Sequence, residues 1–220
     1  MSRESTLSML SSCGVVAVIR APEPAKVAPL VEALAEGGVT GIEITMSTPK
    51  AISVIEHIAD TFGTKICLGA GTILDPATCA DAIHAGARFV VSPIFDPAIV
   101  ECTRRLGGVS IPGAYTPTEI FRAWNAGADV VKVFPATTLG PAYFKDLLAV
   151  MPYLKLTPTG GVDAKTAGAF IAAGAVAVGA GSSLVSKAAL AAGDYAAIRQ
   201  AAAELVQAVK TARGARSLSE

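Results

Sequence analysis

The sequence predicts an α/β fold in which eight parallel strands, each followed by a helix, close into a (β/α)8 TIM barrel. Short runs rich in valine and isoleucine recur along the chain, helical patterns separate them, and glycines stand where a helix passes into the next strand. Strands buried on both faces have this composition, and their alternation with helices is typical of a parallel sheet. The expected strands lie at 15–20, 41–45, 66–70, 88–92, 109–113, 130–134, 154–159 and 175–180.

Helix signals fill the segments between these strands. Apolar residues recur at helical spacing in 49–62, and the stretch TPTE at 116–119 has the pattern of a capping box. A helix is expected before the first strand, and one more helix with a frayed end is expected beyond residue 193. Further helix starts are predicted where a capping residue precedes a proline, at Thr48-Pro49, Asp75-Pro76, Asp96-Pro97 and Thr116-Pro117.

A doubly wound open sheet is the alternative to the barrel. No G-x-G-x-x-G motif follows the first strand, which counts against a dinucleotide-binding sheet. A chain of 220 residues is near the small end for a TIM barrel, so its loops must be short. Because the chain has no linker, low-complexity stretch or charge run, residues 1–220 are predicted to form one domain.

Charge and hydropathy exclude several classes of protein. The 18 basic residues balance 18 acidic ones, which leaves no electrostatic case for binding nucleic acid or an anionic membrane. The first residues lack the pattern of a signal peptide, and no apolar run approaches the roughly 18 residues of a membrane helix. A cytoplasmic protein is therefore expected.

The cysteines and histidines indicate no metal or cofactor. The only histidines, His57 and His84, lie in helical segments without a partner at ligand spacing. The cysteines form no C-x-x-C pair and are expected to be reduced packing residues; they are Cys13, Cys67, Cys79 and Cys102. We therefore expect neither a metal site nor a bound cofactor.

A lysine stands in the middle of the apolar run VVKVF. Residues alternate between the two faces of a strand, so if the purely apolar faces pack on the helices, Lys132 and Glu43 both point into the barrel. Arg20, Thr72 and Thr159 stand at the ends of other strands. Because the active sites of TIM barrels lie at the carboxyl ends of the strands, these residues predict a site there.

The chemistry of such a site follows from the lysine. Burial lowers the pKa of an amine, and a free amine attacks a ketone to form a Schiff base. Glu43 can shuttle protons directly or through water, which suits a lyase acting on a 2-keto acid. Two alternatives stay open at this point: Lys132 and Glu43 could form a buried structural ion pair, and Arg20 could be a surface residue.

Two glycine-rich loops suggest a site for phosphate. PTGGV at 158–162 follows the seventh expected strand, with Asp163 as a helix cap, and GAGSSL at 179–184 follows the eighth and opens into a helix. Glycines expose backbone N–H groups, and TIM barrels often hold a phosphate at these two loops. Tight turns are the alternative explanation for either motif alone.

In combination and in order, the motifs resemble those of the 2-keto-3-deoxy-6-phosphogluconate (KDPG) and 4-hydroxy-2-oxoglutarate (KHG) aldolase family of class I aldolases. The resemblance covers nearly the whole chain. The stretches that carry it are VVAVIRA (15–21), GIEITMSTP (41–49), GAGTILDP (69–76), FVVSP (89–93), IPGAYTPTE (111–119), VKVFPA (131–136), PTGGV (158–162) and GAGSSLV (179–185).

The resemblance implies a role for each matching residue. Lys132 matches the Schiff-base lysine, and Glu43 matches the general acid/base that works through water. Thr72 and Pro93 match residues that line the pyruvate half of the substrate, with Thr72 near its carboxylate. Phe134 matches an aromatic residue that orients the site.

The phosphate-binding loops of the family match Gly160, Gly161 and Ser182. Their neighbours Thr159 and Gly181 are included in the expected substrate site. The family's usual products are pyruvate and glyceraldehyde 3-phosphate, its usual assembly is a homotrimer, and it uses no metal. The pathway stays open between sugar-acid breakdown of the Entner–Doudoroff type and disposal of hydroxyproline-derived keto acids.

The chain departs from the family pattern at one position. The best-known members read like T-L-R-T after the glutamate, and their arginine helps to hold the substrate carboxylate; this chain reads TMST, with Ser47 in that place. A serine cannot supply a bidentate charged contact. Arg20 is a candidate substitute, and the galactonate-derived epimer of KDPG, or KHG, remains an alternative substrate.

Two functions of other classes remain as rivals. The first is a phosphate-binding barrel isomerase or epimerase in which Glu43 transfers protons and Lys132 acts only through its charge. The second is a sugar-phosphate-binding protein without turnover. Only the aldolase needs a covalent intermediate on the lysine.

Overall fold

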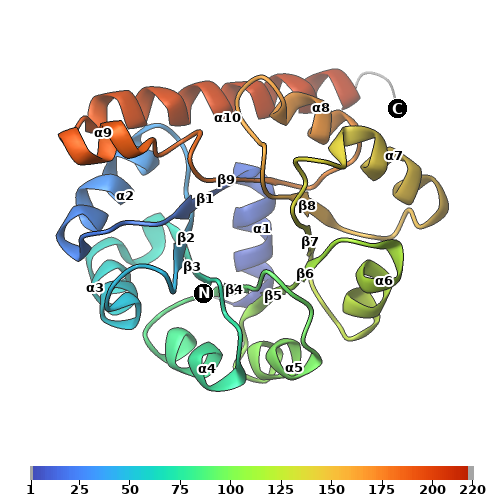
Figure 1. The fold of residues 1–220 in the computed structure, drawn as a ribbon, viewed down its shortest axis with the longest axis horizontal. Helices are drawn as coiled ribbons and strands as arrows, with labels where there is room; N and C mark the ends of the chain where they lie inside the picture. The colour runs from blue at the N-terminus through green and yellow to red at the C-terminus, as the bar shows by residue number, and fades with distance from the viewer. Residues whose placement is uncertain (1, 218–220) are drawn as a thin grey trace.

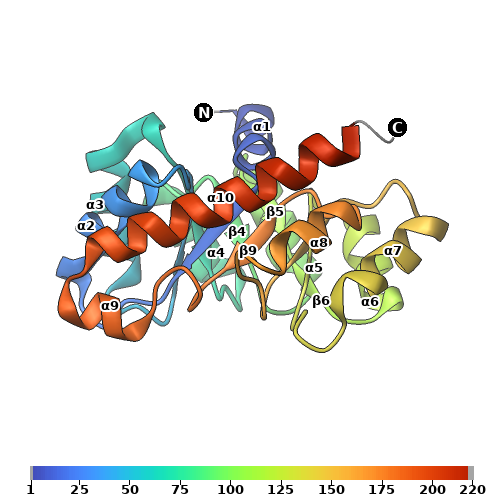
Figure 2. The ribbon, with the colours of Figure 1, turned by 90° about the horizontal axis from the view of Figure 1, so that it is seen from above.

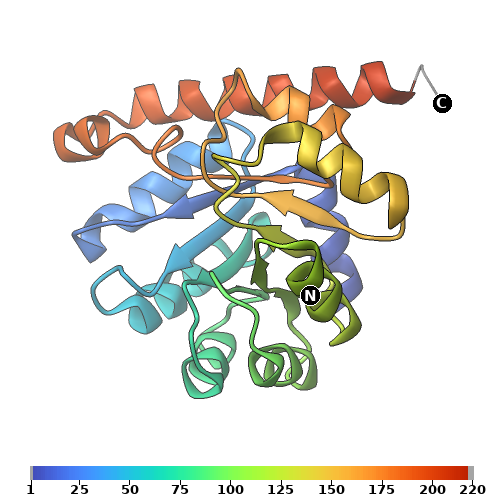
Figure 3. The ribbon, with the colours of Figure 1, turned by 45° about the vertical axis from the view of Figure 1, so that its right-hand side comes forward.

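The computed structural model describes residues 2–217, in which helices and strands alternate along the chain (Figure 1). All the paired strands run parallel (Figure 3). The strands are β1 (Val15–Ile19), β2 (Gly41–Thr45), β3 (Cys67–Gly71), β4 (Phe89–Val91), β5 (Val109–Ile111), β6 (Gly113–Ala114), β7 (Val131–Val133), β8 (Leu156–Pro158) and β9 (Val178–Ala180).

All the α-helices except the first lie in an outer layer around the strands (Figure 1). The α-helices are α1 (Arg3–Cys13), α2 (Val27–Glu36), α3 (Ala51–Phe62), α4 (Pro76–His84), α5 (Pro97–Arg105), α6 (Pro117–Asn125), α7 (Gly140–Val150), α8 (Ala167–Ala172), α9 (Lys187–Ala192) and α10 (Tyr195–Ser217). The short 3-10 turn η1 (Pro24–Lys26) precedes α2, and the short 3-10 turn η2 (Gly63–Lys65) follows α3.

The strands form two parallel sheets. A six-stranded sheet in the order β5-β4-β3-β2-β1-β9 curves into a half-barrel, and β6-β7-β8 form a three-stranded sheet. The strand expected at 109–113 is split at Pro112, which has no N–H to donate to a neighbouring strand. The predicted α/β class and parallel arrangement are confirmed.

Most predicted helix starts are confirmed. Asp75, Asp96 and Thr116 each cap a helix that begins with proline, and Thr116 forms the complete capping box with Glu119. The start predicted at Thr48-Pro49 is wrong, because α3 begins at Ala51. Thr48 is buried instead, and its hydroxyl accepts a hydrogen bond from the backbone N–H of Ala21, two residues beyond the end of β1.

The segment after residue 193 forms the expected helix, α10, with 23 residues. It packs on α8 and α2 and runs along one whole side of the molecule (Figure 2). The predicted frayed end of this helix lies outside the described residues. Within residues 2–217, no helix combines the length and apolar composition needed to cross a membrane.

A second apolar cluster fills the inner side of the curved sheet, apart from the main core between strands and helices. Leu10 of α1 packs there against strand residues, and α1 contacts β1, β2, β3 and β5. Figure 1 shows α1 in the centre of the ring of strands, and Figure 2 shows it projecting from one end. The buried members of the cluster are Leu10, Val16, Cys67, Phe89, Val91, Val109, Ile111 and Val130.

An ion pair links α1 to the segment just before β7. The buried Asp129, just before β7, accepts hydrogen bonds from the Arg3 guanidinium, at 3.2 Å from Nε, and from the Ser110 backbone N–H at 2.9 Å. The Asp129 carboxylate therefore accepts hydrogen bonds from one residue of the helix and one residue of a strand. Removing it would leave the strand N–H without a partner, which is costly in a buried place.

We expect Asp129→Ala to lower the free energy of unfolding by about 2 kcal/mol, because it breaks the hydrogen-bonded pair with the partly exposed Arg3 and leaves the buried Ser110 N–H without a partner. Glu36→Ala is the matched control, since Glu36 forms an exposed ion pair with Arg199 at 3.1 Å and should change stability by less than about 0.5 kcal/mol. Urea unfolding of both variants checks this. Equal effects would contradict the structural role of Asp129.

Candidate active site

Lys132 and Glu43 lie inside the curved sheets, as the alternation along their strands predicts. Lys132 is the central residue of β7 and pairs in register with Gly113 and Thr157, and Glu43 is central in β2. The two residues are only 5% and 3% exposed. Strand pairing therefore fixes the backbone positions of both residues, which lie on strands rather than on loops.

The two charged groups do not pair directly with each other or with another charged residue that the structure describes. In the described part of the chain, no hydrogen bond or ion pair engages the Lys132 ammonium or the Glu43 carboxylate, and no fully buried side-chain polar atom lacks a partner. Both groups therefore reach open space. The Lys132 Nζ lies 4.7 Å from the centre of the Phe134 ring. This geometry disfavours the alternative of a structural ion pair.

Burial shifts both groups towards their neutral forms. Loss of hydration lowers the pKa of Lys132; the Glu43 charge opposes this shift and the Arg20 charge adds to it. Loss of hydration likewise raises the pKa of Glu43, against the positive charges of Lys132 and Arg20. The pair thus combines an amine that can lose its proton with a carboxyl group that can carry one.

A glycine makes room for the Glu43 carboxyl group. A Cβ at Gly71, the last residue of β3, would collide with Glu43 Oε1. The next residue, Thr72, has a φ of 60°, which is unusual for a threonine. Such strained backbone is often found at functional sites, and Thr72 is one of the residues for which the sequence predicts substrate contact.

The two glycine-rich loops, after β8 and β9, line one cavity of about 370 Å³, here called the loop cavity. Gly160 and Gly161 have φ values of 97° and 71°, which a side chain would strain. The structure brings most of the predicted substrate residues together in this cavity: Arg20, Phe134, Thr159, Gly160, Gly161, Gly181 and Ser182.

The loops themselves differ from their expected form. Helices α8 and α9 begin only at Ala167 and Lys187, so neither loop opens directly into a helix. Asp163 caps the turn before α8, where its Oδ1 accepts the N–H groups of Lys165 and Thr166 at 2.9 and 2.8 Å. These hydrogen bonds lower the pKa of Asp163. An anion in this cavity would meet loop N–H groups rather than a helix N-terminus.

Ser183 is a site residue that the sequence reasoning missed. Its Oγ donates a hydrogen bond of 2.6 Å to the Val162 carbonyl and so ties the two loops together. Ser183 stands beside Ser182 in the motif GAGSSL, but only the fold shows that it faces the other loop. This hydrogen bond links the two loops that line the loop cavity.

The remaining predicted residues lie outside the loop cavity. Ser47 lines a separate cavity that Arg20 also borders, and its Oγ lies 2.7 Å from Thr45 Oγ1. Thr72 and Pro93 line neither cavity. The backbone of Pro93 nevertheless closely approaches Gly113, the register partner of Lys132.

The Arg20 guanidinium lies against the loop after β9. A Cβ at Gly181 would be 3.2 Å from its Nη1, so the glycine allows this close approach. Arg20 is exposed to solvent, but it borders the site rather than lying apart from it. No group of three or more potential metal-binding side chains occurs within residues 2–217.

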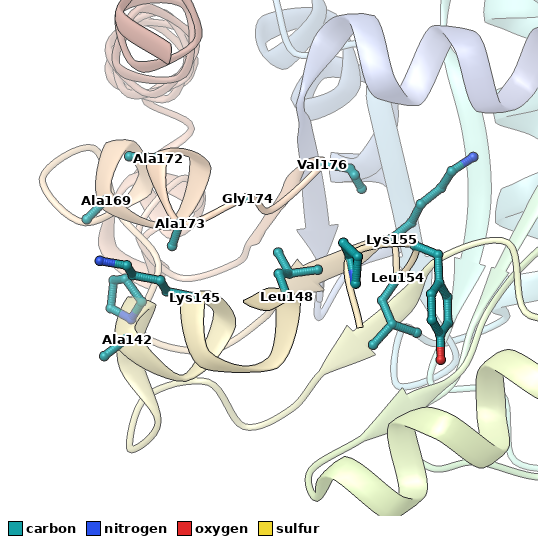
Figure 4. A pocket seen from close by; sticks show the side chains of 13 residues that line it. Ala142, Lys145, Leu148, Leu154, Lys155, Ala169, Ala172, Ala173, Gly174 and Val176 are labelled. Carbon is teal, nitrogen blue, oxygen red and sulfur yellow. The ribbon is translucent and has the colours of Figure 1, made fainter. Parts of the chain in front are cut away.

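A wider groove of about 840 Å³ lies on the outside, between α7 and α8 (Figure 4). Alanines of α8, Ala169 and Ala172, face Ala142 and Leu148 of α7 across it. Its lysines, Lys145 and Lys155, belong to the helical layer and its connection to β8. None of the predicted site residues lines this groove.

Comparison with known proteins identifies the family. Residues 7–201 match the family model described as "KDPG and KHG aldolase". A probable 2-dehydro-3-deoxy-6-phosphogalactonate aldolase of Rhizobium meliloti is 36% identical over 82% of this chain and 85% of its own. The KHG/KDPG aldolase of Escherichia coli is 33% identical over 94% of this chain and 98% of its own.

A solved structure agrees with these relatives. The KDPG aldolase of Legionella pneumophila, with pyruvate captured as a covalent carbinolamine, has a TM-score of 0.84 and 29% identity, and the match covers 91% of this chain and 97% of that one. Sequence and fold thus lead to the same group of enzymes over nearly the full length. The chain belongs to the KDPG and KHG aldolase family.

Proposed function

We propose that the protein is a class I aldolase that cleaves KDPG to pyruvate and glyceraldehyde 3-phosphate. The observation that carries this proposal is a buried lysine without an ion-pair partner, close enough to a buried glutamate for their charges to interact. A structural lysine in this place would be paired. The pyruvate carbinolamine captured in the Legionella relative supports the same chemistry.

The mechanism begins when the free amine of Lys132 attacks the C2 ketone of the substrate. Glu43 donates a proton to the carbinolamine hydroxyl, water leaves, and the protonated imine withdraws electrons from the C3–C4 bond. Glu43, directly or through water, then takes the C4 hydroxyl proton as that bond breaks. The aldehyde departs, the enamine is protonated at C3, and water hydrolyses the imine to release pyruvate and the amine.

The other predicted residues bind the substrate. Gly160, Gly161 and Ser182 hold the phosphate through the two loops. Thr72 and Pro93 line the pyruvate half. Thr72 directly follows β3, which pairs with the strand of Glu43, and Pro93 approaches Gly113, the register partner of Lys132. Arg20 takes over the substrate carboxylate in place of the short Ser47. Neither a metal nor an organic cofactor is needed for these steps.

The galactonate-derived epimer is the second candidate substrate. The Rhizobium relative, named for that epimer, is 36% identical, and the E. coli relative named for KHG and KDPG is 33% identical. The epimers differ only in configuration at C4, next to the bond that breaks. Cleavage rates for KDPG, its epimer and KHG, measured side by side, decide among them.

We also propose that the two sheets are parts of one eight-stranded barrel in a single domain. The bridge between Thr159 and Gly179 links β8 to the β9 edge, and Lys132 N donates to Pro112 O at 2.9 Å between the halves of the split strand. The four cysteines are free, which fits the reducing cytoplasm where we place the protein.

A homotrimer is the assembly we propose. Large apolar side chains are exposed in successive loops and α6 on the side of the carboxyl strand ends, and such patches favour association. They are Leu74, Ile94, Tyr115 and Phe121, which are 54%, 48%, 38% and 43% exposed. Sedimentation equilibrium should give three times the chain mass of 22.2 kDa, and a monomer mass would refute this assembly.

Trapping the covalent intermediate tests the catalytic lysine. We expect pyruvate with sodium borohydride to leave a reduced adduct on Lys132, located by peptide mass spectrometry. Lys132→Ala should abolish the adduct and lower cleavage by several orders of magnitude, whereas Lys155→Ala, at the outer groove, should change neither. Glu43→Gln keeps Lys132 as the nucleophile and should form the pyruvate adduct more slowly. A folded protein without any adduct would favour the isomerase or the binding protein.

The charge of Arg20 should contribute to the low pKa of Lys132, which arises mainly from burial. Lys132 attacks as free amine, which exists above its pKa, and the Arg20 charge contributes to lowering that pKa. Arg20→Gln should therefore raise the pKa and move the acidic limb of the trapping rate to higher pH. Arg20→Lys keeps the charge and should leave the limb in place. Rates at saturating pyruvate check this, and an unmoved limb in both variants would contradict it.

A further inference from the structure

The loop that directly follows β7 connects two neighbouring parts of the site. This segment, residues 134–138, is here called the β7 loop. Phe134 N donates a hydrogen bond to Ala114 O at 3.0 Å, and Ala136 N donates one to Thr159 O at 2.9 Å. The β7 loop is thus bound on one side to the end of β6 and on the other to the first residue after β8. Its position therefore affects both neighbours.

The β7 loop packs against the glycine-rich loop after β8. A Cβ added at Gly160 or at Gly161 would lie 3.2 Å from Thr137 Oγ1. Thr137 is not among the residues that line the loop cavity, so it supports the glycines and does not contact a ligand there. Because glycine has the most flexible backbone, this packing limits where the N–H groups of the loop can point.

Two tyrosines attach the far end of the β7 loop to its surroundings. The hydroxyl of Tyr115 lies 3.0 Å from Thr138 Oγ1. The hydroxyl of Tyr143, in α7, donates a hydrogen bond of 2.7 Å to the Tyr115 carbonyl, and Glu119 Oε2, in α6, accepts one of 3.0 Å from the Tyr115 N–H. Side chains of two helices thus fix the backbone of Tyr115, and its own side chain reaches the β7 loop.

The charges around these tyrosines keep the hydrogen bonds in place at neutral pH. Loss of hydration raises the pKa of Tyr143, and the negative charge of Glu119 adds to this shift, so the Tyr143 hydroxyl keeps its proton and can donate. Hydrogen bonds from the N–H groups of Thr116 and Tyr115 lower the pKa of Glu119. Glu119 is therefore ionised, and a charged acceptor forms the stronger hydrogen bonds.

We propose that Tyr115 and Tyr143 are positioning residues for the phosphate half of the site. They hold Thr138 in place, and through it they press Thr137 against the glycine loop, which then keeps the shape that binds phosphate. The proposal rests on the aldolase function above and on its placing of the phosphate at the two glycine-rich loops. Neither tyrosine lines the loop cavity, so both act through the β7 loop.

The test uses two acceptor aldehydes for pyruvate that differ only in the phosphate, D-glyceraldehyde 3-phosphate and D-glyceraldehyde. Tyr115→Phe and Tyr143→Phe each remove one hydrogen bond and keep the aromatic ring. We expect each to raise KM for glyceraldehyde 3-phosphate about fivefold, within the range of one lost hydrogen bond, with kcat nearly unchanged. The value of kcat/KM for D-glyceraldehyde should stay within about twofold.

The matched control is Tyr153→Phe, which removes the hydroxyl of a tyrosine at the outer groove and should change neither reaction. Thr138→Val breaks the contact with Tyr115 from the other side. Because both changes remove the same interaction, the double variant Tyr115→Phe/Thr138→Val should lose no more than either single variant. Losses that multiply in the double variant would show that this hydrogen bond is not the cause.

The outcomes separate the positioning role from the aldolase function. If pyruvate forms no borohydride adduct on Lys132, the aldolase function is wrong, and the positioning role with it. If the adduct forms but the wild-type protein adds both aldehydes equally well, the phosphate is wrongly placed, and the positioning role is also wrong. If the wild-type protein prefers the phosphorylated aldehyde, but the tyrosine variants slow both additions equally or neither, only the positioning role is refuted.

Discussion

The site depends on keeping the Lys132 ammonium out of water without pairing it. An amine in water is protonated at neutral pH, and one in an ion pair is held in that form; neither attacks a ketone. The structure avoids both by placing the lysine at the centre of β7, above a layer of apolar side chains and beside the Phe134 ring. Glu43 is close enough to influence it and too far to neutralise it directly.

This arrangement needs small residues at defined places. Gly71 leaves space for the Glu43 carboxyl group, and Gly69, two residues earlier in β3, leaves space for the ring of Phe89. The same strand thus makes room for an apolar layer and for a polar layer above it. In the loops, Gly181 lets the Arg20 guanidinium approach, so glycine controls the position of three functional or supporting side chains.

Much of the fold and of the site could be predicted because short-range sequence patterns determine it. Alternation in β2 and β7 was enough to place Glu43 and Lys132 on the inner face, and the capping residues at Asp75, Asp96 and Thr116 act within one helical turn. The failures involve distant partners. Thr48 accepts a hydrogen bond from the Ala21 N–H, just beyond β1, instead of capping a helix, and Ser183 donates one to the other glycine loop. Neither contact can be predicted from the adjacent residues.

Helix α1 affects the route by which substrate and products enter and leave the site. It covers the amino ends of several strands, and the apolar layer above it fills that end of the interior. Substrate is therefore expected to reach Lys132 from the opposite end, where the loop cavity lies, and both products are expected to leave through that opening. Pyruvate, attached to the lysine, is the inner fragment, and the aldehyde is the outer one. Because the covalent bond to Lys132 keeps pyruvate at the inner end of this opening, the aldehyde is expected to leave first.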